Sequence, residues 1–153
     1  VPDLLTLVPE KRQELTTEGG LDVVRQKDHL RKTILRFHEK NIPVSLFVDP
    51  IREQIEASKE IGADMIELHT GEYAEATTES DLKRLLQEIF AAAEYGKQLG
   101  LNVNAGHGLN YTNVKPVAQI PFIDEMSIGH AIISHAVFVG LENAVKEMLA
   151  LVK

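Results

Sequence analysis

Residues 101–109, Leu-Asn-Val-Asn-Ala-Gly-His-Gly-Leu, decide the fold class of this chain. Residues 101–105 have the composition of a short strand, and His107 follows them directly, held between two glycines. Gly100, just before the strand, is placed to end a preceding helix. A helix, a strand and then a polar glycine turn is the sequence of elements found in parallel β/α folds.

The same alternation continues in both directions from this stretch. We predict further strands at residues 4–8, 44–48, 65–69 and 123–128. Apolar spacing predicts helices at residues 21–41, 49–62, 78–99, 114–118 and 131–152, with a polar loop at residues 71–78. We expect Asp49 to cap the second helix with Pro50 in its first turn, and we expect a kink near Gly140. Strands separated by helices in this way form a parallel sheet.

Polar residues at the strand ends favour a barrel over a doubly wound sheet. Glu67 and His69 end one predicted strand, His107 follows the next, and Gly129 and His130 follow the last. Barrel active sites lie at the carboxyl ends of the strands, and the loops after the last two strands often hold phosphate. We therefore expect a functional site where these residues meet.

The composition limits the classes of function. The chain has 153 residues, enough for one domain, and a net charge of -7, which argues against nucleic acid as a partner. It has no cysteine, and therefore no disulfide or thiolate chemistry. No apolar run approaches the roughly 18 residues of a membrane span, so we expect no membrane partner and a cytoplasmic location. The chain starts at Val1 rather than Met, and we expect it to begin within a longer protein.

Four stretches in this order resemble the pyridoxine 5′-phosphate synthase family. They are residues 7–14 with 16–20 (LVPEKRQE and TTEGG), residues 66–71 with 73–74 (IELHTG and YA), residues 102–111 (NVNAGHGLNY) and residues 127–133 (SIGHAII). The resemblance covers essentially all of the chain and places these stretches at the family's fourth, sixth, seventh and eighth strands. It implies an α/β TIM (β/α)₈ barrel in which residues 1–153 are the C-terminal part of a single domain. A barrel needs about 250 residues, so about the first three βα units would be missing.

The resemblance also implies a reaction. The family condenses 1-deoxy-D-xylulose 5-phosphate with 3-amino-2-oxopropyl phosphate to pyridoxine 5′-phosphate, releasing phosphate and water, and it uses no metal and no organic cofactor. Its members are oligomeric, so we expect small phosphorylated substrates and a homo-oligomer. The missing units would carry part of the catalytic site, so we expect this chain alone to be inactive.

His107 and Glu67 are the predicted catalytic residues. A histidine can give and take the protons that ring closure requires, and an inward-facing carboxylate is costly unless it is paired or used. By resemblance, His107 is the general acid and Glu67 stabilises cationic, imine-like intermediates. The alternatives are an ordinary turn residue for His107 and a structural ion pair for Glu67. His69 shares the strand face of Glu67 and could orient it.

The predicted substrate-binding residues are Thr16, Gly108, Gly129 and His130. Backbone N–H groups at a helix start favour an anion, and glycine allows a close approach. By resemblance, the last three bind substrate phosphate and Thr16 contacts the ligand. A simple turn for Gly129 and loop hydrogen bonding for Thr16 are the alternatives. Lys11 and Arg12 are candidate cations at the rim, with solvated loop charges as the alternative.

The remaining histidines are assigned no chemistry. His29 and His38 lie on a predicted helix and are expected at the surface. His135 stands where the family usually has arginine, which can change packing or an interface.

Two other functions remain open from the residues alone. Glu67, His69, His107 and His130 could ligate zinc in a metal-dependent barrel hydrolase. Alternatively, the chain could be a noncatalytic barrel fragment that self-associates through its open sheet edges. A monomer in sizing experiments would count against the fragment.

Overall fold

The computed structural model describes residues 2–9 and 19–152. The strands are β1 (Leu5–Leu7), β2 (Val44–Val48), β3 (Met65–His69), β4 (Asn102–Gly106) and β5 (Glu125–Ser127). The helices are α1 (Val23–His38), α2 (Arg52–Glu60), α3 (Gly71–Glu75), α4 (Glu79–Gln98), α5 (Val114–Ala118), α6 (His130–Val139) and α7 (Leu141–Val152). None of these helices, within the described ranges, is long and apolar enough to cross a membrane.

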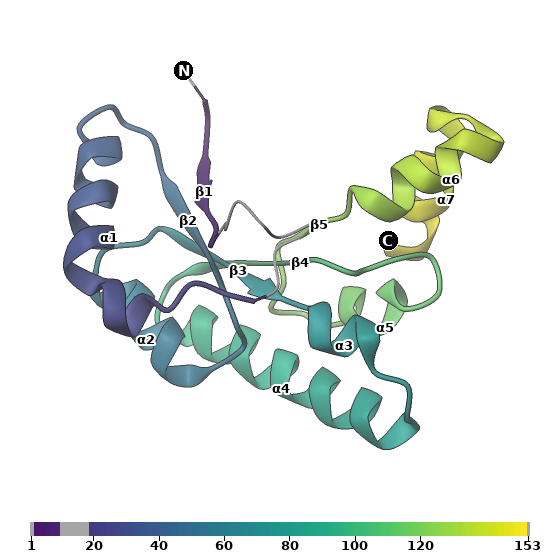
Figure 1. Ribbon diagram of the computed structural model, residues 1–153, viewed down its shortest axis with the longest axis horizontal. Coiled ribbons are helices and arrows are strands. Elements are labelled where there is room, and N and C mark those ends of the chain that lie inside the picture. Colours follow the sequence, from purple (N-terminus) through teal and green to yellow (C-terminus); the bar gives the residue numbers. More distant parts are fainter. Residues whose placement is uncertain (1, 10–18, 153) are drawn as a thin grey trace.

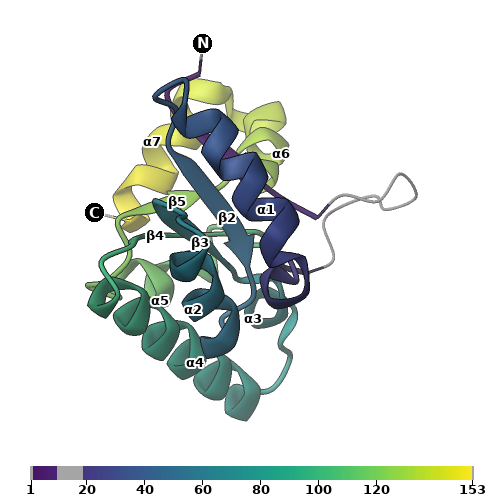
Figure 2. The same ribbon diagram turned by 90° about the vertical axis from the view of Figure 1, so that its left-hand side faces the viewer.

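The strands form one parallel sheet in the order β1-β2-β3-β4-β5. The sheet is curled into a half-barrel, and the helices follow an arc around it from α1 through α2 and α4 to α6 and α7 (Figure 1). Figure 2 shows this arc from the side of α1, with α4 at the lower edge and α6 and α7 at the upper edge. The strand order never reverses, whereas a doubly wound sheet reverses at its ligand crevice. The predicted α/β fold is confirmed as a five-stranded parallel half-barrel.

The two faces of the sheet have opposite character. Glu67 and Asn104 are partners in the register of β3 and β4 and lie on the concave face. The neighbouring row, Leu46, Ile66 and Val103, points to the helices and is fully buried. Aliphatic packing against the helices therefore provides the core, while the concave face is free to carry polar side chains.

Helix starts agree with the sequence in one case and differ in another. The helix predicted at residues 78–99 is confirmed as α4, and Thr78 caps it by accepting a hydrogen bond from the Asp81 N–H at 3.1 Å. The predicted capping role of Asp49 is wrong, because α2 begins at Arg52 after Ile51, which has no capping side chain. The Asp49 carboxylate contacts other groups, described below.

Two further differences come from local backbone geometry and tertiary contacts. Residues 71–78, predicted as a polar loop, contain the short helix α3, which is anchored by the buried Tyr73 through a 2.9 Å hydrogen bond from its hydroxyl to the Asn113 carbonyl. The predicted kink at Gly140 is a full break between α6 and α7, because Gly140 has a φ of 82°, which a right-handed helix cannot contain.

Candidate active site at the carboxyl ends of the strands

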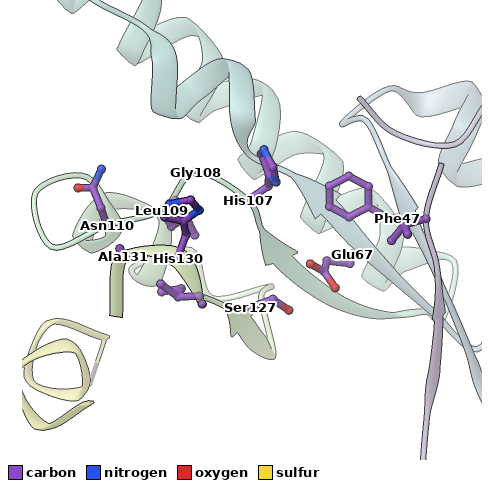
Figure 3. Close-up of a pocket in the computed structure, with 12 residues that line it drawn as sticks. Phe47, Glu67, His107, Gly108, Leu109, Asn110, Ser127, His130 and Ala131 are labelled. Atoms are coloured by element: carbon purple, nitrogen blue, oxygen red, sulfur yellow. The ribbon is translucent and has the colours of Figure 1, made fainter. Parts of the chain in front are cut away.

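A cavity of about 550 Å³ lies at the carboxyl ends of β2 to β5 (Figure 3). It has the size of a small-molecule site. Its lining includes the predicted residues Glu67, His107, Gly108, Gly129 and His130, together with Val8, Phe47, Leu109, Asn110, Ser127, Ile128 and Ala131. Thr16, Lys11 and Arg12 lie outside the described residues. One cavity therefore collects five of the six predicted site residues.

Glu67 faces the cavity from the middle of β3. A side chain at Gly106, its neighbour on β4, would place a Cβ under 3.0 Å from the Glu67 carboxylate, so the glycine makes room for this carboxylate. Burial raises the pKa of Glu67, and a hydrogen bond with the Ser127 side chain partly counteracts this. Among the described residues, no cation acts on the Glu67 carboxyl. The structural ion pair considered for Glu67 is therefore not present in this part of the chain.

His107 sits in a strained turn directly after β4. Its φ of 81° is in the left-handed region, which a residue other than glycine seldom adopts. The buried Thr70 hydroxyl holds this turn, lying 2.7 Å from the Gly106 carbonyl oxygen and 2.6 Å from the His107 carbonyl oxygen. Strained backbone that is supported in this way is common at active sites.

The surroundings of the His107 ring favour its neutral form. Burial lowers the pKa of His107, and the neighbouring His69 and His130 lower it further, against an opposing contribution from Glu75. A neutral imidazole can accept a proton on one ring nitrogen while it donates from the other. His107 is thus suited to proton transfer near neutral pH.

Gly108 and Gly129 are glycines for different reasons. Gly108 has a φ of 74°, and a Cβ there would come under 3.0 Å from the Ala74 methyl, so the fold itself requires glycine. Gly129 has a φ of -110°, and an added Cβ would meet no protein atom within 4 Å. Packing therefore does not explain the glycine at position 129.

The amino terminus of α6 opens into the same cavity. Gly129 is the residue before the helix, and no side chain caps it. The first N–H groups of a helix lack partners within the helix and carry the positive end of its dipole, so they favour an anion. This end of α6, with Gly129 and His130, has the features of a phosphate site.

Two residues near the site, Asp49 and Thr70, have contacts that the sequence did not predict. Asp49 follows β2 and lies 2.9 Å from His69 Nδ1 through its Oδ1 atom. The expectation that His69 orients Glu67 is therefore wrong. His69 forms its hydrogen bond with Asp49, and Glu67 forms one with the Ser127 side chain. The position of Asp49 at a carboxyl strand end was the signal that could have identified it.

The zinc alternative has no donor set in the described part of the chain. No three His, Asp or Glu side chains there are grouped closely enough to share a metal ion, and Glu67, His69, His107 and His130 are no exception. A metal-dependent hydrolase built on these four residues is therefore not supported by their geometry.

The contrast between the two glycines gives a prediction. Gly129→Ala should change the free energy of unfolding by less than about 0.5 kcal/mol but weaken the binding of inorganic phosphate, because the new methyl occupies the cavity. Gly108→Ala should destabilise the fold by about 1–3 kcal/mol through backbone strain. Urea unfolding and phosphate titration followed by NMR would measure both effects. Unchanged phosphate binding in Gly129→Ala would contradict the assignment of the anion site.

Fold and site together define a class: parallel α/β half-barrels with a small-molecule cavity at the carboxyl ends of the strands. The chain belongs to the family described as pyridoxal phosphate biosynthesis protein PdxJ, whose model matches residues 1–153. It is similar to curated pyridoxine 5′-phosphate synthases over 152 residues, 99% of its length: 55% identical to that of Thermodesulfovibrio yellowstonii, 52% to that of Chlorobium phaeobacteroides and 51% to that of Pelobacter propionicus. It spans 62% of the length of the first relative and 64% of the other two.

Proposed function

We propose that this chain supplies the phosphate-binding and proton-transfer part of a pyridoxine 5′-phosphate synthase. The reaction would condense 1-deoxy-D-xylulose 5-phosphate with 3-amino-2-oxopropyl phosphate, releasing phosphate and water. The observation that carries the proposal is the single cavity shared by Glu67, His107 and the amino terminus of α6, in a chain of this family. The names of the curated relatives support the same reaction.

The residues on the concave face would have different roles in the reaction. Gly129 and His130 would hold a substrate phosphate at the start of α6, where the helix dipole favours the anion. His107 would move protons at the reacting carbon skeleton, since its neutral ring faces the same space. Thr16 is proposed as a ligand contact from the resemblance alone.

Glu67 would respond to the charge of the bound intermediate. Its carboxyl has a raised pKa because it is buried without a cation among the described residues. A cationic, imine-like intermediate would supply that missing charge and favour the ionised carboxylate. The interaction would thus be strongest when the positive charge develops, which is the requirement for lowering a barrier.

The proposed whole protein is a TIM barrel in which residues 1–153 form the C-terminal part of one domain. The half-barrel, its sequential strand order and the share of each relative that the chain covers support this arrangement. About three βα units would complete the circle of eight. The expected cytoplasmic location stays a prediction.

Product formation tests the function directly. The chain would be assayed with both substrates, alone and after mixing with the N-terminal part of the Thermodesulfovibrio yellowstonii relative that it does not match. We expect product only in the mixture, because the cavity would then be closed by both pieces. A mixture that folds and associates but forms no product would contradict the proposal.

Self-association is a second candidate property, and two observations favour it. Strands β1 and β5 are the edges of the sheet among the described residues, and open edges recruit partners. In addition, α6 exposes large apolar side chains: Ile133 at 61%, Val137 at 79% and Phe138 at 86%. Exposed apolar clusters of this kind mark contact surfaces.

We therefore expect the isolated chain to sediment as a homo-oligomer. Phe138→Ser should shift it toward monomer, because the most exposed apolar side chain of α6 is removed. Leu35→Ser on α1, which is 56% exposed, is the matched control and should leave the oligomer unchanged. Analytical ultracentrifugation over a range of concentrations measures both. A monomeric parent chain would exclude this property.

A further inference from the structure

We propose that Asp49 and His69 form a positioning pair that holds the His107 imidazole at the wall of the cavity. His69 ends β3 and His107 follows β4, so the two rings come from neighbouring strands. Neither Asp49 nor His69 lines the cavity. The inference rests on the proposed role of His107, but its principal test needs no catalysis.

The Asp49 carboxylate fixes which His69 nitrogen carries the proton. Its Oδ1 atom accepts hydrogen bonds from the Gly20 N–H and from His69 Nδ1, both at 2.9 Å. The His69 bond lowers the pKa of Asp49, so the carboxylate is ionised and can only accept. The proton is therefore on His69 Nδ1, and in the neutral ring Nε2 is left without one.

The oriented His69 ring is one of the surfaces that His107 rests on. The ring centroids of His69 and His107 are 5.1 Å apart, and the Phe47 ring is 5.1 Å from His69 and 6.3 Å from His107. His69 is itself only 7% exposed. Rotation of the His69 ring would therefore remove its contact with the His107 ring.

Gly71 shows how closely the two histidines meet. A Cβ at this position would lie under 3.0 Å from His69 Nε2 and 3.2 Å from His107 Cδ2. Both rings therefore converge on the same backbone position at the start of α3. An Asp49 contact on one edge of His69 and Gly71 on the other leave that ring little freedom to turn.

A second Asp–His pair in the chain shows what a purely structural pair looks like. Asp64 Oδ2 lies 2.7 Å from His38 Nε2 and also accepts the Val44 N–H at 2.8 Å. This pair is at the amino-terminal ends of the strands, and the His38 side chain is 35% exposed, against 6% for that of His69. The Asp64–His38 pair is therefore a matched control, because it has the same hydrogen-bonding groups but does not lie beside the cavity.

The test is histidine NMR on the ¹⁵N-labelled chain. In the wild type we expect His69 to carry a proton on Nδ1, the nitrogen that faces Asp49. Asp49→Asn replaces the carboxylate with an uncharged amide oxygen, a weaker acceptor, so the fraction of His69 with its proton on Nδ1 should fall and the ring signals of His107 should change with it. The charged and titratable groups facing His107 are His69, Glu75 and His130, so their signals are followed together.

The control and a second variant separate positioning from general damage. Asp64→Asn should alter the His38 signals and leave those of His107 as in the wild type. His69→Phe keeps a ring beside His107 but removes the hydrogen bond to Asp49, so the His107 ring signals should change. It also tests the pair if Asp49→Asn does not fold. A changed His69 tautomer with unchanged His107 signals, or unchanged His107 signals in His69→Phe, would overturn the inference.

Kinetics give an independent readout wherever the wild-type mixture forms product. Asp49→Asn should lower kcat about 10²-fold, the effect of misplacing a group by about 1 Å, with little change in either KM. If the wild-type mixture forms no product while the NMR changes occur, the proposed function fails and the positioning pair stands. If product forms and the NMR changes are absent, only the positioning pair fails.

Discussion

His107→Asn should lower pyridoxine 5′-phosphate formation in the completed barrel by about 10²–10⁴-fold, the usual contribution of a general acid or base. Asparagine is the suitable replacement because it tolerates the left-handed backbone at this position, where φ is 81°, better than most residues do. Loss of activity would then reflect the missing imidazole rather than a disturbed turn. Steady-state assays at saturating substrate measure the effect.

The control for His107 is another histidine outside the cavity. His29 is exposed on α1, and His29→Asn should leave the rate unchanged. Full activity in His107→Asn, with the fold intact by circular dichroism, would contradict the proton-transfer role.

The pH dependence of stability follows from the lowered pKa of His107. The folded state binds a proton on His107 less readily than the unfolded state, in which the value is near 6.5. This stabilising contribution is complete above about pH 6.5 and is lost as the pH falls through the folded-state value. His107→Asn should therefore remove part of the acid sensitivity of unfolding.

Glu67→Gln should have opposite effects on stability and on activity. At neutral pH it should raise the free energy of unfolding by about 0.5–2 kcal/mol, since the half-buried carboxylate has no cation among the described residues and glutamine avoids its desolvation. Product formation in the mixture should nevertheless fall by at least about tenfold, because the developing positive charge loses its counter-charge.

The sign of the pH effect makes the Glu67 prediction specific. Because the pKa of Glu67 is raised on folding, the carboxyl lowers the free energy of unfolding only at pH values at which it is ionised. The increase in the free energy of unfolding caused by Glu67→Gln should be complete above the folded-state pKa of Glu67. It should disappear as the pH falls toward 4.5, the pKa of the carboxyl in the unfolded chain. Urea unfolding at several pH values measures it. An advantage that is constant with pH would contradict the burial argument.

Much of the fold was predictable because its signals are local. The bounds of β2, β3 and α5 match the predicted ranges, since each is a short run with apolar residues that has a glycine or proline within it or close to its ends. The start of α4 near residue 78 was predictable for the same reason. The grouping of Glu67, His107 and His130 followed from a general property of parallel sheets, whose carboxyl ends meet at one edge.

The features that were missed depend on contacts between distant residues. Asp49 and His69 are separated by 20 positions, and Thr70 and His107 by 37. A capping role for Asp49 was the reasonable local interpretation, but the tertiary partner offered a buried hydrogen bond instead. α3 was missed for a similar reason, because the hydrogen bond that anchors Tyr73 reaches an acceptor 40 positions away.

The sequential strand order has a consequence for how such a protein can be made. Every strand pairs with the strand that follows it in the chain, so each new βα unit can add to the growing sheet in the order of its synthesis. Pairing between neighbours closes short loops, which folds faster than pairing between distant segments. Only the last step, joining the first strand to the eighth in a full barrel, would require a long-range encounter. A genetic split between two βα units would therefore turn one neighbouring pairing and the closing step into encounters between two chains, and leave the other pairings local.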